Sequence, residues 1–259
     1  MTRLATALLL ASTALAGTAS AQTMVALTAD NQLVRIDGES RRASAPVRVS
    51  GAEGRLLGID QRPADGRLYG LTDAGQIVTL DPMTGRATAV SRLSERLDAG
   101  GRAVVDFNPA ADRLRVMGLS GQNLRVNVEN GQAVVDGTLK YAPGEWSGTS
   151  PRVTAGAYTN SMAGTTSTML LTLDTTAGLL NLQNPPNDGV QAPRGRVSMP
   201  LPAGTAFDIL STGPGNNRGF LIAGGALHTI GLEDGRVETL GAVAGLPTGS
   251  EVIDVAAMR

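Results

Sequence analysis

The chain has no cysteine among its 259 residues, and it has a single histidine, His228, and a single lysine, Lys140. Disulfides are therefore excluded, and burial together with ladder hydrogen bonds must hold the fold. Zinc, copper and iron sites draw mainly on cysteine and histidine, so the composition argues against them. The formal net charge of −1 gives no general attraction to nucleic acid or anionic lipid, and neither is an expected partner.

The usual short motifs of catalysis are missing as well. The sequence contains no GxSxG, HExxH or P-loop motif and no GxGxxG after a strand-like run. His228 lies in an apolar run with no serine or cysteine nucleophile motif near it. The sequence therefore assigns no catalytic residue and no organic cofactor, and it favours a protein that is not an enzyme.

The first 21 residues have the pattern of a secretory signal. Arg3 supplies the positive charge, residues 4–16 form a short apolar run, and Ala19, Ser20 and Ala21 fit the small-residue cleavage rule, with the cut before Gln22. The apolar run is shorter than the roughly 20 residues that a bilayer requires, so stable membrane insertion is not expected. We predict an exported protein, periplasmic or extracellular, with a single domain over residues 22–259.

The rest of the chain is rich in glycine and in short runs that alternate between apolar and polar residues, which indicates an all-β fold. Two segments, beginning at Gly58 and Val104, align without a gap. The matched positions are turn glycines, prolines and strand starts: Asp60 with Asp106, Pro63 with Pro109, Arg67 with Arg113, Gly75 with Gly121, and Gly85 with Gly131. Conservation of such positions within one chain is typical of a repeated four-stranded unit.

Weaker copies begin at Ala155 and Ala206, and one further copy is divided between the two ends of the chain. Residues 24–49 match only the later strands of a unit, and residues 251–259 supply its first strand. A divided unit is typical of a ring that closes by pairing its terminal strands, as in a β-propeller. We predict five four-stranded blades of about 48 residues each. The alternative is six blades, with a degenerate unit hidden in residues 131–152.

One aspartate recurs in the first strand of four units and allows two interpretations. The residues are Asp60, Asp106, Asp208 and Asp254, while the remaining unit has Ala157. As a functional group, these carboxylates would line a central channel and could hold calcium, which prefers oxygen ligands. As scaffold, each would accept hydrogen bonds from backbone amides of the neighbouring blade. Repetition favours the scaffold interpretation, and four near-equivalent carboxyls argue against the unequal pair that glycoside hydrolysis requires.

The third unit contains polar residues that its siblings lack. Asn123 occupies a position that is apolar in the other units. The position of Arg115 holds Val25 and Tyr69 in two other units, and Asn108 aligns with Arg62. The expected hairpin register pairs Leu114 with Val126 and Val116 with Leu124, which sets Arg115 opposite Arg125. Two like charges across strands need compensation. One interpretation is an internal carboxylate, either Glu129 or one on the next blade, that forms an inter-blade salt-bridge network. The other is a bound anion or carboxylate-bearing ligand near Arg115, Asn123 and Arg125.

Residues 140–151 form the longest irregular insertion and contain the only tryptophan, Trp146. An exposed aromatic residue on a propeller loop can serve as a platform for a partner. The other interpretation, which we favour, is that Trp146 holds the insertion against its blade.

Several strings also resemble a known family: GIDQRPADGRLYGLT, DFNPAADRLRVMGLSGQNLRVN, and GAYTN followed by QNPPNDG. They are similar to the bacterial secreted family called domain of unknown function 4394, over nearly the whole chain after residue 21. The resemblance implies an exported, propeller-like β domain and carries no catalytic residues.

Together these observations predict a monomeric, exported, non-catalytic β-propeller that binds a protein or small ligand. The candidate ligand-facing residues are Arg115, Asn123, Arg125, Asn108 and Trp146. The alternatives are a hydrolase or lyase that acts on a glycan or lactone through the channel carboxylates, and a purely structural envelope protein.

Overall fold

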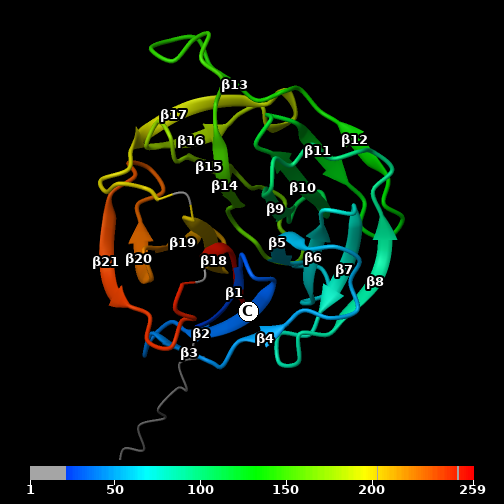
Figure 1. Ribbon diagram of the computed structural model, residues 1–259. Helices are drawn as coiled ribbons and strands as arrows, with labels where there is room; N and C mark the ends of the chain where they lie inside the picture. The colour runs from blue at the N-terminus through cyan, green and yellow to red at the C-terminus, as the bar shows by residue number, and fades with distance from the viewer. Residues whose placement is uncertain (1–21, 203, 250) are drawn as a thin grey trace, which may run out of the picture.

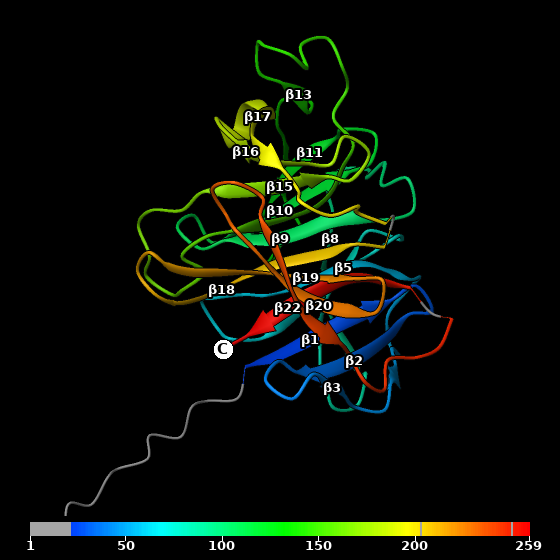
Figure 2. The same ribbon diagram turned by 90° about the vertical axis from the view of Figure 1, so that its left-hand side faces the viewer.

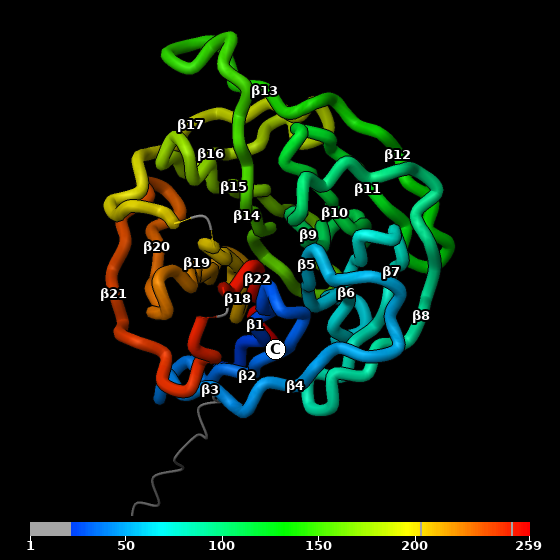
Figure 3. Tube along the Cα trace, in the orientation of Figure 1, coloured from blue at the N-terminus to red at the C-terminus, as the bar shows by residue number. Residues whose placement is uncertain are grey.

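Five sheets surround a central axis in the computed structural model, which describes residues 22–202, 204–249 and 251–259 (Figure 1). The predicted secretory signal lies outside the described residues. Each sheet is one blade, and the blades follow one another around the ring in the order of the sequence, as the tube trace makes easy to follow (Figure 3). The predicted five-bladed propeller is therefore confirmed, and the six-bladed alternative is wrong.

The first blade is the one divided between the chain ends. Its innermost strand is β22 (Val252–Met258), which pairs with β1 (Thr23–Thr28), and β2 (Gln32–Asp37), β3 (Arg42–Ala43) and β4 (Val47–Arg48) complete it. The register sets Met24 opposite Ala257 and Ala26 opposite Val255. Closure by pairing of the terminal strands was predicted and is confirmed.

The other four blades are each built from consecutive strands. The second comprises β5 (Leu56–Gln61), β6 (Leu68–Thr72), β7 (Gln76–Leu80) and β8 (Ala87–Arg92). The third comprises β9 (Ala103–Asn108), β10 (Arg113–Gly118), β11 (Asn123–Val126) and β12 (Ala133–Val135). The fourth comprises β14 (Val153–Tyr158), β15 (Leu170–Asp174), β16 (Leu179–Gln183), β17 (Val190–Arg196) and the added edge strand β13 (Lys140–Tyr141). The fifth comprises β18 (Ala206–Gly213), β19 (Asn216–Ala223), β20 (Ala226–Ile230) and β21 (Val237–Ala242).

Residues 131–152, the segment that the six-bladed alternative used, form the outer edges of two blades. They supply β12 at the edge of the third blade and β13, which runs parallel to β17, at the edge of the fourth. The chain between β13 and β14 projects outward from the ring in both views (Figures 1 and 2). The only helical element in the described ranges is the short 3-10 helix η1 (Pro186–Asp188), and no helix there is long and apolar enough to span a membrane.

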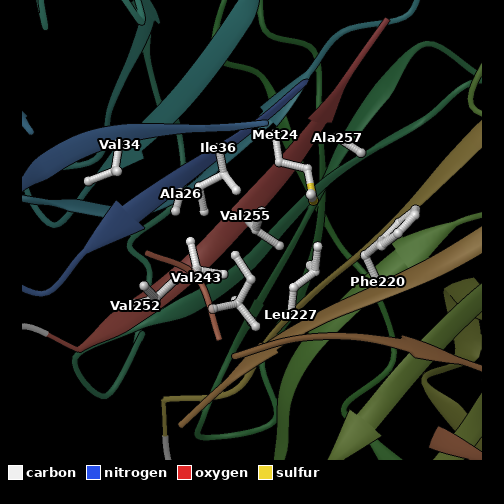
Figure 4. Packing of buried hydrophobic residues seen from close by; sticks show 12 residues of the cluster. Met24, Ala26, Val34, Ile36, Phe220, Leu227, Val243, Val252, Val255 and Ala257 are labelled. Atoms are coloured by element: carbon white, nitrogen blue, oxygen red, sulfur yellow. The ribbon is translucent and has the colours of Figure 1, made fainter. Parts of the chain in front are cut away.

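Apolar side chains pack between blades and not in one central core. A buried cluster occupies each of the five interfaces, because each blade is sandwiched between two neighbours and buries both faces. Figure 4 shows the cluster between the first and fifth blades, where Met24, Ile36 and Val255 lie near Leu227 and Phe220. The cluster between the third and fourth blades has six buried members and is the smallest, since polar side chains take up much of that interface.

The innermost strands β5, β9, β14, β18 and β22 contact one another in sequence and form the wall of the channel. All five run in the same direction along the axis, so their first residues lie on one side of the ring. We call that side the entry face. The loops that lead into the inner strands, and the turns between the second and third strands of each blade, lie there.

Candidate functional site

The four recurring aspartates lie on inner strands, at the centre of the ring, and we call them the aspartate ring. Three of them accept a hydrogen bond from the next blade around the channel: Asp254 from the N–H of Ile59 (2.8 Å), Asp60 from that of Phe107 (2.7 Å), and Asp106 from that of Tyr158 (2.9 Å). Asp208 completes the set by accepting from the N–H of Ala257 (2.6 Å). These bonds are the ones that the scaffold interpretation expects, and Ala157 leaves the fourth blade without its own.

The inner wall approaches the ring closely at Gly58 on β5. A Cβ atom placed on this residue would lie 2.8 Å from an Asp254 carboxylate oxygen and 2.7 Å from a methyl carbon of Val105. Glycine therefore makes room for the carboxylate that bonds the adjacent N–H of Ile59.

Burial gives the ring carboxyls unusual proton affinity. Desolvation raises the pKa of Asp254 to about 8 and that of Asp208 to about 6, although backbone donors and, for Asp254, Arg102 act in the opposite direction. Desolvation also raises the pKa values of Asp60 and Asp106 well above the usual range, and neighbouring ring carboxylates raise them further. At neutral pH the ring therefore holds protons and carries fewer than four negative charges.

Asp60, Asp106 and Asp208 each place one side-chain oxygen within 4.8 Å of the others, which is close enough for a shared cation. Calcium, however, takes six to eight oxygen ligands. The same three carboxylates already accept backbone N–H groups and are buried. The expectation that the recurring aspartates serve as scaffold and hold no calcium stays a prediction.

Arg102 lies between the aspartate ring and the entry face. It directly precedes β9, and its Nη2 atom donates to the carbonyl of Ile253 (2.6 Å) and to that of Thr205 (3.1 Å), so the side chain links the starts of three inner strands. Burial lowers the pKa of this guanidinium, and the nearby carboxylates of Asp254 and Glu251 oppose that shift. The bonds fix the guanidinium at the entry-face end of the channel.

A pocket of about 620 Å³ opens above Arg102 on the entry face, and we call it the mouth pocket. Loops and strand starts of the first three blades line it: Ala29, Arg55, Leu56, Leu57, Asp73, Leu97, Asp98, Ala99, Gly100, Gly101, Arg102, Leu119, Glu251 and Ile253. Apolar side chains and five charged ones share this surface. No member of the aspartate ring lines the pocket, whereas Arg102 does, so a molecule that occupies the pocket meets Arg102 and not the channel carboxylates.

The polar residues of the third blade form an inter-blade network. The predicted register is confirmed, with Arg115 opposite Arg125. The compensating carboxylate is Asp136, which accepts from Arg115 Nη1 (2.6 Å) and from both Arg125 Nε (2.7 Å) and Nη2 (2.9 Å). The suggested carboxylate, Glu129, instead lies 3.3 Å from Arg62.

Other donors and acceptors complete the surroundings of Arg115. Its Nη1 donates to Asn123 (2.8 Å), its Nη2 to Asn187 of η1 (2.8 Å), and its Nε to the hydroxyl of Tyr158 (3.2 Å). Asn123 also donates to the carbonyls of Gly137 and Pro186. Arg115 is 1 % exposed and Asn123 is 0 % exposed, so both side chains serve the contact between blades and present no surface to a ligand.

The remaining sequence candidates lie away from the mouth pocket. Asn108 accepts from the N–H groups of Ala110 and Ala111 (3.0 Å each) and caps a turn. Trp146 is half-buried on the projecting loop, with its ring centroid 5.8 Å from that of Tyr141 and with the Arg196 guanidinium 5.6 Å above it. These contacts are the ones expected of a tryptophan that holds its loop against the blade.

His228 is buried, and its ring nitrogens lie 2.9 Å from the Thr239 hydroxyl and 3.3 Å from the Ala223 carbonyl. It is a hydrogen-bonded interior residue. Sequence reasoning did not single out Arg102, Asp136 or Glu251. Arg102 lies just outside the aligned segments. Asp136 aligns with Val90 and Glu251 with Leu57, so neither carboxylate recurs in the unit with which it was compared.

Comparison with solved structures supports the fold. A protein of unknown function from Bacteroides thetaiotaomicron VPI-5482 is 14 % identical, with a TM-score of 0.53, over 92 % of this chain and 65 % of that one, so this chain spans about 65 % of that neighbour's length. A protein of unknown function from Bacteroides caccae is 10 % identical, with a TM-score of 0.50, over 93 % of this chain and 100 % of that one. Identities this low show the fold alone.

A comparison with curated proteins gave no match. The family model described as "Domain of unknown function (DUF4394)" matches residues 20–256. This range begins just before the first blade and ends inside the last inner strand, so it takes in all five blades. The chain belongs to the DUF4394 family.

Proposed function

We propose that this chain is an exported, non-catalytic propeller that binds a ligand or partner at the entry face, in the mouth pocket. The observation that carries the proposal is the convergence of loops from three blades around one pocket of about 620 Å³. Binding sites concentrate on loops that a rigid scaffold positions, and a volume of this size suits a small molecule or a few side chains of a partner. The signal-like pattern of residues 1–21 supports export.

Binding is favoured over hydrolysis because the channel carboxyls are engaged by backbone donors and lie outside the lining of the mouth pocket. Asp60, Asp106 and Asp208 are buried and Asp254 is half-buried. All four accept backbone N–H groups, and desolvation raises the pKa of each. Hydrolysis of a glycosidic bond needs one acid and one differently tuned carboxylate beside the substrate. In this chain Arg102 lies between the ring and the mouth pocket.

The test is affinity capture from a cell-envelope extract with the chain from Gln22 onward and two charge-reversal variants. Asp98→Lys changes an exposed carboxylate of the mouth pocket, and Glu39→Lys changes an exposed carboxylate in the turn after β2, on the opposite face. We expect the parent chain and Glu39→Lys to retain the same component and Asp98→Lys to lose it, while circular dichroism shows all three folded. Equal retention by Asp98→Lys would overturn the placement of the site.

A further inference from the structure

A second pocket lies beside the mouth pocket on the entry face, between the fifth and first blades. Its volume is about 360 Å³, and we call it the glycine pocket. Its lining comprises Pro202, Gly204, Ile222, Ala223, Gly224, Gly225, Leu246, Pro247, Gly249, Glu251 and Val252. Glu251 is the only charged residue in this set. Every other side chain among the described residues that line the pocket is apolar, and these side chains suit an apolar group.

Three of the glycines that line this pocket lie in turns with open space beside them. Gly224, Gly225 and Gly249 have positive φ angles of 57°, 76° and 78°, and a Cβ atom on any of them would meet no other atom within 4 Å. The chain turns at these positions without filling the space above it. The glycines contribute backbone to the lining, and Leu246 and Pro247 contribute apolar side chains. The end of β19 and the start of β22 also line the pocket.

Glu251 forms the boundary between the two pockets and lines both of them. Its backbone carbonyl accepts from the N–H of Ala29 (2.8 Å), which fixes the position of the residue. Its side chain leans over Gly204, where a Cβ atom would lie 2.2 Å from the Glu251 Oε1 atom. The carboxylate is thus held at the edge of an apolar pocket and remains exposed to solvent.

The charges around Glu251 favour a cation. Asp73, Asp98 and Glu251 bring three exposed carboxylates to the mouth pocket. Of the two arginines, Arg102 donates to two backbone carbonyls, and Arg55 donates to the carbonyl of Ala29. Both guanidiniums keep their charge, so the mouth pocket carries three carboxylates and two guanidiniums, a net charge of 2 − 3 = −1. Asp73 Oδ1 accepts from the backbone N–H of Arg55 (2.9 Å), whereas Asp98 and Glu251 present their carboxylates to solvent.

We propose that the ligand is a small organic cation, an amine next to an apolar group, with the amine at Glu251 in the mouth pocket and the apolar group in the glycine pocket. This inference rests on the proposed function and gives its ligand a chemical class. A carboxylate next to an apolar cavity gives both charge attraction and burial, and a ligand that has only one of the two groups loses the other contribution. The two pockets together have the size that a drug-sized molecule needs.

The test is a ligand-detected NMR titration of the chain from Gln22 onward with three probes of matched size: phenethylamine, 2-phenylethanol and 3-phenylpropionate. We expect the amine to bind about tenfold more tightly than the alcohol, and the carboxylate to bind most weakly. The preference for the amine should shrink as salt rises, because salt screens an exposed charge pair. Equal binding of the amine and the carboxylate would overturn the inference.

Substitutions in the two pockets test where the amine and the apolar group of the probe bind. Glu251→Gln should reduce the affinity for the amine to that for the alcohol, whereas Glu238→Gln, at an exposed position on β21, should leave it unchanged. Leu246→Gln should weaken the amine and the alcohol alike, because it places an amide in the apolar wall. An amine affinity that Glu251→Gln leaves intact would also overturn the inference.

The capture experiment distinguishes failure of the proposed binding site from failure of the proposed ligand class. If Asp98→Lys loses the captured component but the probes show no preference for the amine, the mouth pocket stands as a binding site and the cationic ligand is wrong. If Asp98→Lys retains that component and no probe binds, both proposals are wrong.

Discussion

Replacement of Asp254 by asparagine should change how the stability of this propeller depends on pH. Burial raises the pKa of Asp254 to about 8, whereas an aspartate in the unfolded chain titrates near pH 4. Between these values the folded state binds a proton that the unfolded state does not. The ionisation of Asp254 therefore costs the folded state nothing at low pH, and it lowers the free energy of unfolding as pH rises from about 4 toward 8.

The size of the effect follows from the proton count. One extra bound proton in the folded state changes the free energy of unfolding by about 1.4 kcal/mol per pH unit. Asp254 alone should therefore lower the stability of the parent chain by roughly 2–3 kcal/mol between pH 6 and pH 8. Asp208, whose pKa burial raises to about 6, adds a loss of the same sign mainly between pH 4 and pH 6.

Asp254→Asn removes this proton and keeps one acceptor oxygen for the N–H groups of Ile59 and Val255. Loss of the second acceptor should cost about 1–3 kcal/mol at pH 5. The variant should then lose less stability on the way to pH 8, so that the two curves converge or cross.

Urea unfolding followed by far-ultraviolet circular dichroism at pH 5, 6, 7 and 8, at constant ionic strength, measures both slopes. Parallel curves for the parent and the variant between pH 6 and pH 8 would refute the reasoning, as would a parent chain whose stability rises over that range.

Three further predictions concern the interior. Arg115→Met should lower the free energy of unfolding by about 3–5 kcal/mol in chemical denaturation, because a network of buried partners loses its centre; a loss below 1 kcal/mol would show that the network contributes little. Gly58→Ala should lower the free energy of unfolding by about 1–3 kcal/mol, because the added carbon clashes with Val105 and Asp254. Gly213→Ala, where only one atom lies near the added carbon, should leave that free energy almost unchanged. Equal losses of stability in the two variants would contradict the packing argument. Millimolar calcium should leave the thermal midpoint of the EDTA-treated chain unchanged, since backbone donors and protons already satisfy the ring; a rise of several degrees would place the ion in the channel.

The repeat explains why the architecture could be predicted from the sequence. Strand starts, turn glycines and the recurring aspartate have to be kept in each blade, because every blade makes the same contacts with the next one. The same periodicity gave the register that sets Arg115 opposite Arg125. The repeat also predicted the divided first blade, because the alignment shows a unit at the N-terminus that lacks its first strand and a single extra strand at the C-terminus.

The candidate site could not be predicted in the same way. Arg102, Asp98 and Glu251 lie in loops between blades, and these loops differ in length and composition from one blade to the next. Polar residues that depart from the repeat, such as Arg115 and Asn123, instead indicated an unusual contact between two blades. The partner Asp136 is the last aligned residue and stands opposite Val90, so the repeat gave no indication that this carboxylate faces Arg115. Glu129, the residue suggested from the sequence, contacts Arg62 instead.

The closure of the ring has a consequence for the order of assembly. Four blades are built from contiguous sequence, but the first needs β22, which pairs with β1 from the opposite end of the chain. The contact that shuts the ring is therefore among the longest in sequence separation, and such contacts form late and slowly. A chain that emerges from its N-terminus, whether from a ribosome or through a membrane, can complete β1 to β4 early but must leave their inner edge unpaired until its last residues arrive. During that interval the edge of β1 is open to pairing with other chains, which makes it the segment most in need of protection before the propeller closes.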